Sequence, residues 1–298
     1  MNGVDDETGL YSLVPKREGD EFLGYIYSNT GDRADEFKAQ FNYERVFNER
    51  HRVGAMAMYY QRSFNNLAAG SSILALPYRK QGLAFRATYS YDDRYFIEYN
   101  MGYNGSENYP SGRRFGFFPA GSIGWIATNE GFLKDNKVLT FLKLRASYGV
   151  TGNNRISYNA ALEVLNSANY VTGKGTGALV NGSANISSSL ANSNITWEQT
   201  DEFNYGLDLG LFNNRINLAI DAYYSVTRAL LFEQPTQSFT GYTHYWNNIG
   251  KVRNSGLEIQ LDTHNMKSRK FSWDTNINFS LSRNKLLELG GEQQMISL

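Results

Sequence analysis

Hydrophobic and polar residues alternate in several long runs in the last third of the chain. In Phe203–Leu211 every second residue is apolar, and the residues between them are polar or glycine. After Asn213-Asn214 the alternation resumes through Ile216–Val226, and it returns in Phe271–Leu281. Because successive side chains of a strand point to opposite faces, each segment has one apolar and one polar face. The pattern predicts consecutive antiparallel β-hairpins.

These alternating runs are long. Strands of soluble proteins usually span about 5–6 residues, whereas about 9–11 tilted residues cross a bilayer. The sequence therefore predicts an all-β, antiparallel transmembrane β-barrel. Four residues are expected to face lipid: Leu207, Leu209, Leu218 and Ile277. Asn217 and Asn278 are expected to face the lumen.

Taken along the whole chain, the alternation predicts about eleven strands whose connections alternate between short and long. The short connections are Asn48-Glu49-Arg50, Asp92-Asp93-Arg94 and Asn213-Asn214, and the long ones span 64–81, 104–114, 151–194 and 233–245. In outer-membrane barrels short turns face the periplasm and long loops face outward. Pro119 lies inside a predicted strand and indicates a bulge or a poorly paired position.

An odd number of strands leaves open edges, and unpaired backbone in lipid costs several kcal/mol per group. We therefore expect the chain to be part of a larger barrel. Residues 1–21 are predicted to be an irregular lead-in or loop, and residues 22–298 a partial barrel that begins with a strand at Phe22–Asn29. The N-terminus carries no signal-peptide pattern. If the protein is exported, the gene product is expected to start further upstream.

Composition supports a membrane barrel and narrows the alternatives. The chain has no cysteine, which excludes disulfides and thiolate sites, and its net charge of zero gives no electrostatic reason to expect nucleic acid. Aromatic residues make up 14%, including 21 tyrosines, which fits the girdles of a barrel. The sequence contains no run of about 20 apolar residues, so it predicts no membrane-spanning helix. The alternative is a soluble sandwich or propeller, but the polar faces are rich in Asn, Ser, Asp and Gly, which suit a hydrated lumen.

No motif in the sequence predicts catalysis or a cofactor. His51, His244 and His264 lie far apart without metal-site spacing. The glycine-rich segment Gly173–Gly177 lacks the spacing of a phosphate loop, and no Gly-x-Ser-x-Gly elbow occurs. Asp208 and Asp221 are expected to face the lumen together as solvated carboxylates. The chain is predicted not to be an enzyme, and no metal or cofactor is assigned.

Aromatic residues in the long loop near 239–246 are the candidates for substrate contact. They are Tyr242, His244, Tyr245 and Trp246. Flat rings with polar edges stack on sugars or pack on peptides. The alternative is that these rings belong to an interfacial girdle or pack within the loop, since Tyr and Trp are enriched at such boundaries.

Several short segments occur in an order and spacing that resemble a known family. They are Tyr89–Tyr95, Asn104-Gly105-Ser106, Arg114–Ala120, Gly124-Trp125, Phe141–Gly149, Thr151-Gly152-Asn153, Trp197-Glu198-Gln199-Thr200, Gly206-Leu207-Asp208, Asn213-Asn214-Arg215, Gly241-Tyr242, Asn247–Gly250 and Asn254–Glu258. Together they resemble the SusC/RagA branch of TonB-dependent outer-membrane transporters. The resemblance covers residues 80–290 well and 20–80 loosely.

The resemblance implies a barrel of about 22 strands, of which this chain would supply about half, in the outer membrane of a Gram-negative bacterium. It further implies a plug domain, a SusD-like surface lipoprotein and energy from the TonB–ExbB–ExbD machine, with oligosaccharides or peptides as cargo. The plug and the last strands of the family are not in this chain. The alternative is an outer-membrane porin or adhesin with a non-energised barrel. A barrel-embedded hydrolase would need a Ser/His/acid cluster, which these residues do not assemble.

Overall fold

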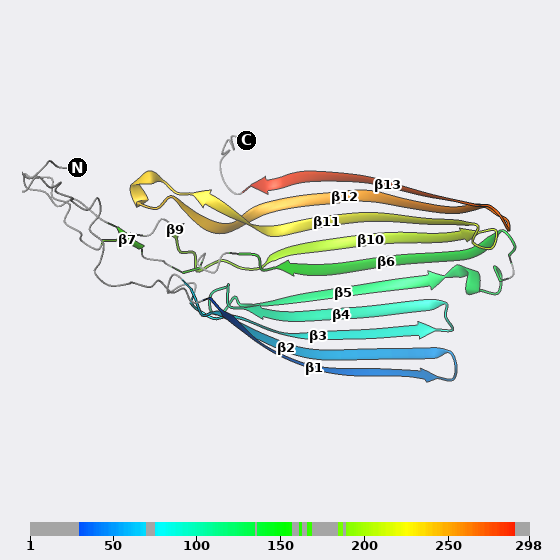
Figure 1. Ribbon diagram of the computed structural model, residues 1–298, viewed down its shortest axis with the longest axis horizontal. Helices are drawn as coiled ribbons and strands as arrows, with labels where there is room; N and C mark the ends of the chain where they lie inside the picture. The colour runs from blue at the N-terminus through cyan, green and yellow to red at the C-terminus, as the bar shows by residue number, and fades with distance from the viewer. Residues whose placement is uncertain are drawn as a thin grey trace, which may run out of the picture.

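The computed structural model describes residues 30–69, 75–134, 136–156, 161–162, 166–168, 184–186 and 189–289. One curved antiparallel sheet of eleven strands dominates this part of the chain, and ten of its strands follow one another in the order of the sequence (Figure 1). The ten are β1 (Asp32–Phe47), β2 (His51–Asn66), β3 (Tyr78–Tyr91), β4 (Tyr95–Ser106), β5 (Phe115–Ile126), β6 (Leu139–Asn153), β10 (Glu198–Leu211), β11 (Ile216–Pro235), β12 (His244–Lys267) and β13 (Ser272–Leu289).

The remaining elements are short and lie in the connections. The eleventh strand of the sheet is β9 (Ser189–Leu190), which pairs in parallel with the start of β12. A separate small sheet consists of β7 (Asn166–Ala168) and β8 (Ala184–Ile186). Two 3₁₀ turns, η1 (Ala127–Asn129) and η2 (Ser238–Thr240), complete the described part.

The short turns gather at one end of the sheet and the long loops at the other, as the sequence predicts (Figure 1). The turn residues Asn48, Asp92, Asn213 and Asn214 have φ between 48° and 60°, a left-handed conformation that Asn and Asp tolerate better than most residues. We call this end the turn end and the opposite end the loop end. Three of the four long loops are shorter than predicted, because the strands beside them continue beyond the alternating segments. The connection between β6 and β10 is shifted instead, from the predicted 151–194 to 154–197.

β11 and β12 also extend in this way, and they pair with each other past the last alternating residue. Their register shifts between Thr227 and Leu230, and Ala229 lies there with φ of 54°. This bulge breaks the side-chain periodicity. It explains why the sequence predicts a loop at 233–245 where the strands still pair to Pro235 and His244.

The strand register places all four predicted lipid-facing residues on one face of the sheet. Leu209 pairs with Leu218, Leu218 with Leu261, and Leu261 with Ile277. Asn217 pairs with Gly210, on the opposite face. The apolar face is exposed: Phe41, Ile123 and Tyr205 have 67%, 60% and 60% of their surface accessible.

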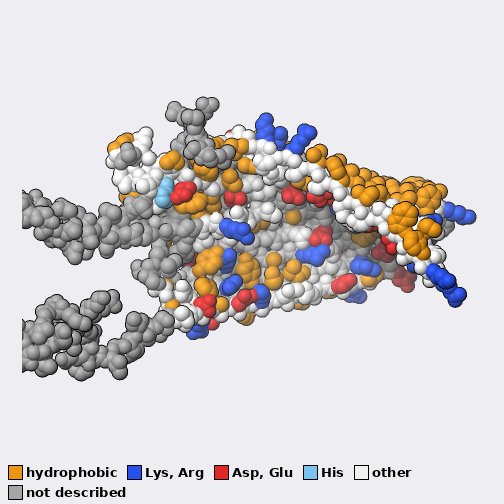
Figure 2. All heavy atoms as spheres, turned by 45° about the horizontal axis from the view of Figure 1, so that its top comes forward, with side chains coloured by type: hydrophobic (Ala, Val, Ile, Leu, Met, Phe, Trp, Pro, Cys, Tyr) orange, Lys and Arg blue, Asp and Glu red, His pale blue; other side chains and the backbone are white. Residues whose placement is uncertain are grey.

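No second sheet or helical layer covers the apolar face in the described part of the chain. A soluble sandwich would bury it, and the only buried cluster of hydrophobic residues in the described ranges lies elsewhere, at the loop end. Figure 2 shows charged side chains in the hollow of the sheet and hydrophobic side chains gathered along the outside of one edge. The hollow face is therefore the polar one, as in the wall of a barrel.

The sheet is open at both edges within the described residues, and Pro119 lies where its pairing is incomplete. Within the described residues β1 pairs only with β2, and β13 only with β12. Pro119 pairs with Met101 without a bulge, but the pairing of β5 with β6 starts only at Ala120, so Pro119 marks a poorly paired position. The predicted strand Phe22–Asn29 and the boundary at residue 21 lie outside the described residues and stay predictions.

No helix in the described residues is long and apolar enough to cross a membrane.

Candidate functional site

The polar face of the sheet carries an ion pair that joins three strands. Arg145 of β6 binds both oxygens of Asp208 in β10, each at 3.1 Å, and both oxygens of Asp221 in β11 at 2.7 and 2.8 Å. Its guanidinium lies over Gly206, where a Cβ atom would come within 2.4 Å of Cζ. The two aspartates therefore share one guanidinium, which corrects the expectation that they are separately solvated.

A second charged group lies on the same face in β3 and β4. Arg86 donates to Glu98 at 2.9 Å, and Asn100 donates to the other oxygen of Glu98 at 2.8 Å. Between this pair and Arg145 the wall is hollowed by a pocket of about 420 Å³. Lys143 lies at its edge, with Nζ 6.0 Å from the ring of Phe96. The wall thus offers hydrogen-bond donors and acceptors to a polar molecule in the hollow.

Arg145→Met is expected to lower the free energy of unfolding by about 1–2 kcal/mol. Removal of the guanidinium leaves Asp208 and Asp221 facing each other, and the side chain of Arg145 is one-third exposed, so the usual value for charged hydrogen bonds is reduced by solvent screening. Urea unfolding of the full-length receptor in lipid vesicles measures the change. Adding Asp208→Asn and Asp221→Asn should restore most of the loss. An effect no larger than that of Arg155→Met, at an exposed arginine, would contradict this role.

Five buried hydrophobic residues form a cluster at the loop end, and we call it the mouth cluster. They are Tyr109, Phe118, Ile156, Ile195 and Trp197, with 8% of their surface accessible or less. The ring of Trp197 packs 5.0 Å from that of Tyr109 and 5.2 Å from that of Phe118. Phe118 belongs to β5. Tyr109 lies in the connection between β4 and β5, and the other three residues lie in the connection between β6 and β10. The cluster therefore fixes connecting segments against the polar face of the sheet.

Hydrogen bonds complete the mouth cluster. The hydroxyl of Tyr109 donates to the carbonyl of Asn153 at 2.9 Å, and Nε1 of Trp197 donates to the carbonyl of Arg114 at 3.1 Å. Burial raises the pKa of Tyr109, so its hydroxyl stays protonated and acts as a donor at neutral pH. Both polar atoms of the buried aromatic pair thus have partners, which lets them sit in an apolar environment.

At the turn end Glu130 connects two aromatic residues of the apolar face. Its Oε1 accepts from the hydroxyl of Tyr95 at 2.6 Å and from Nε1 of Trp125 at 3.2 Å. Its Oε2 accepts from Arg94 at 3.2 Å. The hydrogen bond from Tyr95 is the main cause that lowers the pKa of Glu130, and Trp125 and Arg94 add to it. The carboxylate thereby fixes a Tyr and a Trp at the height where a girdle is expected.

Replacement of this carboxylate should have a pH-dependent effect. Because the pKa of Glu130 is lower in the folded state than its usual value of 4.5, ionised Glu130 stabilises the fold above that pH, and this contribution fades as the pH falls through the folded pKa. Glu130→Gln should therefore lower Tm at pH 7 and have a shrinking effect below about pH 4.5. Thermal unfolding across this range measures it. A Tm difference that stays constant down to pH 3 would contradict the ionic role.

The chain is similar to known proteins both in sequence and in structure. The family model "TonB dependent receptor-like, beta-barrel" matches residues 4–292. The chain belongs to the TonB-dependent receptor family. TonB-dependent receptor P39 of Formosa agariphila is 32% identical to it over 278 residues. TonB-dependent receptor SusC of Bacteroides thetaiotaomicron is 33% identical over 210 residues, which confirms the resemblance to the SusC branch.

The relatives also define which part of a receptor this chain represents. The alignments cover 85% and 69% of the chain but only 26% and 20% of P39 and SusC, so the chain spans about a quarter of the length of such a receptor. In structure it is similar to the RagAB peptide transporter, with a TM-score of 0.75 and 21% identity over 87% of the chain and 30% of the transporter. The siderophore receptor PirA of Pseudomonas aeruginosa has a TM-score of 0.55, at 11% identity over 86% of the chain and 44% of the receptor.

The match identifies the two faces of the sheet. Members of this family are receptors of the outer membrane rather than enzymes, and their barrels place the apolar face in lipid and the polar face in the lumen. The loop end is accordingly extracellular and the turn end periplasmic. The described residues contain no group of three or more His, Asp or Glu placed to hold a metal ion.

The candidate residues for substrate contact lie together at the extracellular end, with different surroundings. His244 binds Glu233 at 2.9 Å, and the hydroxyl of Tyr245 donates to Gln234 at 2.7 Å. Trp246 packs against the mouth cluster, as the loop-packing alternative expects for that residue. Tyr242 accepts a hydrogen bond at its carbonyl from Thr236. A role in substrate contact stays a prediction for all four.

One residue joins this region to the mouth cluster. Asn248 of β12 exchanges hydrogen bonds with the backbone of Thr196, at 2.9 Å in both directions. The same side chain donates to the carbonyl of Ala229, in the bulge of β11, at 2.8 Å. Asn248 therefore connects the bulge, β12 and the segment that ends in Trp197. Asn248 belongs to Asn247–Gly250, one of the segments that carry the family resemblance. This resemblance is the feature of the sequence that indicates the importance of Asn248.

Proposed function

We propose that the protein to which this chain belongs imports oligosaccharides or peptides across the outer membrane, energised by TonB. The observation that carries the proposal is a barrel wall of the SusC branch with an apolar outer face and a lumen face of paired charges. Charges paired within the wall, such as Arg145 with its two aspartates, keep the lumen polar without a strong net field. A large neutral or zwitterionic solute suits such a surface.

We further propose that a SusD-like surface lipoprotein covers the extracellular mouth and that the TonB–ExbB–ExbD machine acts through a plug domain. The mouth cluster and the segment 195–197 supply a rigid platform at this end, and a rigid platform suits the docking of a second protein. The RagAB structure, described as a peptide transporter, is similar in fold. It supports the class of function and leaves open whether sugar or peptide is carried.

Uptake by cells that express the full-length receptor tests the proposal. Fluorescently labelled oligosaccharides or oligopeptides should enter the periplasm of cells with TonB and a proton gradient, and this uptake should stop when TonB is deleted. Affinity purification of the receptor should recover a SusD-like lipoprotein. Uptake that is unchanged without TonB, or steady ion conductance by the purified receptor in a planar bilayer, would contradict energised import and indicate a passive pore.

A further inference from the structure

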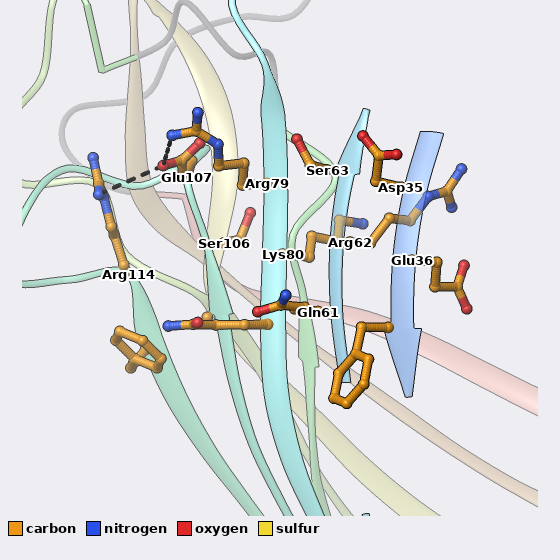
Figure 3. A pocket seen from close by; sticks show the side chains of 14 residues that line it. Asp35, Glu36, Gln61, Arg62, Ser63, Arg79, Lys80, Ser106, Glu107 and Arg114 are labelled. Atoms are coloured by element: carbon orange, nitrogen blue, oxygen red, sulfur yellow. Dashed lines mark ion pairs between the residues drawn. The ribbon is translucent and has the colours of Figure 1, made fainter. Parts of the chain in front are cut away.

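The outward face of β1–β5 contains a groove that the import function does not use. Its volume is about 450 Å³ (Figure 3). One row of paired residues crosses all five strands through it: Phe37, Gln61, Gln81, Gly105 and Phe115. By the alternation of side chains this row shares its face with the lipid-facing residues of the same strands. The groove therefore opens away from the lumen.

Aromatic rings form its two walls. Phe115 stacks on Tyr103 with 5.2 Å between ring centroids and 14° between planes, and its ring covers Gly105, where a Cβ would come within 2.6 Å of Cε1. On the other side Phe37 packs against Tyr59 at 6.3 Å. Phe37 and Phe115 remain 54% and 44% exposed. The walls stand four strand spacings apart, or about 19 Å between backbones, with two glutamine amides on the floor.

Charged residues border the groove on its extracellular side. Figure 3 shows Glu107 between Arg79 and Arg114, whose Nη1 atoms lie 3.6 and 3.9 Å from Oε1 of the glutamate. These distances are long for charge-assisted hydrogen bonds, and the two arginine side chains are 59% and 45% exposed. Asp35, on the same border, is paired with Arg33 at 3.0 Å. The arginines thus retain donors for an anion that approaches from outside.

The groove lies at the outer boundary of the membrane. On the outward face of β4, Tyr95, Ile97, Tyr99, Met101 and Tyr103 follow one another before Gly105 and Glu107. The ten residue steps from Tyr95 to Gly105, of about 3.3 Å each, give about 33 Å along the strand. At a strand tilt of about 40° this is a height of about 25 Å, which is that of the apolar band of an outer-membrane barrel. Tyr103 is therefore at the extracellular girdle, and the arginines lie just above it.

We propose that this groove binds the phosphorylated saccharide headgroup of a glycolipid of the outer leaflet. The rings of Phe37 and Phe115 contact the sugar faces, the amides of Gln61 and Gln81 bond its hydroxyls, and Arg79 and Arg114 bind phosphate. The acyl chains of the same lipid follow the apolar face towards the periplasm. Cargo in transit passes on the opposite side of the sheet, so the occupant of this groove belongs to the membrane.

Binding of two matched glycolipids to the full-length receptor tests the proposal. Native mass spectrometry in detergent compares bisphosphorylated lipid A with its dephosphorylated form. The wild-type receptor should bind the phosphorylated lipid at least about tenfold more tightly, the effect of one charge-assisted hydrogen bond. Arg79→Gln with Arg114→Gln should abolish this preference and leave the dephosphorylated lipid unaffected. Phe37→Ala with Phe115→Ala should weaken both lipids to a similar extent.

Controls separate the groove from general charge and folding effects. Arg155→Gln with Arg269→Gln removes two exposed arginines elsewhere and should preserve the preference. Heat-dependent gel mobility verifies that each variant is folded, and the comparison of two lipids on one variant does not depend on its stability. Equal binding of both lipids by the wild type, or a preference that survives in the Arg79/Arg114 variant, would overturn the proposal. Loss of self-association with unchanged lipid binding would assign the groove to a second copy of the receptor instead.

Discussion

Leu207→Arg is expected to lower the free energy of unfolding in lipid by about 2–4 kcal/mol, because a charge near the middle of the apolar band must leave water. Leu207 pairs with Leu144 and Ile220, two other residues of the outward face. Urea-induced unfolding of the full-length receptor in vesicles measures the loss. Leu209, Leu218 and Ile277 share this face and should respond in the same sense, by less where the residue lies nearer the boundary.

The matched control changes the face and keeps the charge. Asn217→Arg and Asn278→Arg place the same side chain in the hydrated lumen, and we expect less than about 1 kcal/mol for each, as for ordinary surface substitutions. Asn278 pairs with Gln260 and Asn217 with Asp262, so a new arginine meets polar neighbours. Equal losses on both faces would contradict the assignment of the apolar face to lipid.

Trp197→Ala is expected to cost about 3–5 kcal/mol, the range for loss of a buried aromatic side chain. Trp197 is 6% exposed and contacts both rings of the mouth cluster. The substitution also leaves the carbonyl of Arg114 without its hydrogen bond from the indole. Because the cluster joins two extracellular connections, hydrogen exchange should accelerate in residues 107–114 and 195–197 while the central strands stay protected.

Phe239→Ala provides the aromatic control for this prediction. Phe239 lies in the connection between β11 and β12 and is 84% exposed, so its truncation should change stability by less than about 0.5 kcal/mol. Similar losses for Trp197→Ala and Phe239→Ala would show that the mouth cluster does not fix the extracellular end. Retention of exchange protection at 107–114 in the Trp197 variant would lead to the same conclusion.

The strands and their faces were predictable because lipid imposes a simple rule on the sequence. Between the two membrane boundaries, every side chain on the lipid face of the sheet must be apolar. Leu207, Leu209 and Leu218 follow this rule. The turns were predictable where Asn or Asp occupies a left-handed position, as at Asn213 and Asn214. Phe212 also adopts φ of 53°, which its residue type does not indicate. Its backbone N–H donates to the carbonyl of Val138 at 2.8 Å, a contact between two connections that no local pattern indicates.

Outside the bilayer the same rule no longer applies, and there the sequence is less informative. β11 and β12 continue past the bulge at Ala229 with no alternation to show it, which is why the sequence predicted a loop where they pair. The mouth cluster joins Tyr109 to Trp197 across a long stretch of chain. Each is one aromatic residue among many, and no local pattern marks it as buried. Only the packing of two connections against the sheet brings them together.

The ion pair of Arg145 shows the same limit inside the barrel. Alternation predicted that Asp208 and Asp221 share the lumen face, but not that a third strand supplies their partner. The register of β6 against β10 determines this contact, and the connection between these strands covers residues 154–197. No turn of fixed length specifies that register, so the cation opposite the two carboxylates could not be identified from the sequence.

The central claim is that the apolar face of the sheet lies in lipid and the polar face in water. The chain contains no cysteine. Single cysteines are introduced at each position from 216 to 226 of β11 in a full-length receptor from which any cysteine outside this chain has been replaced, and they are labelled with a nitroxide. Collision with oxygen and with a water-soluble nickel chelate then reports lipid or water at each site. We expect the two accessibilities to alternate with a period of two and in opposite phase, with oxygen highest at Leu218, Ile220 and Ala222. Uniform accessibility, or a chelate maximum at these residues, would contradict the account.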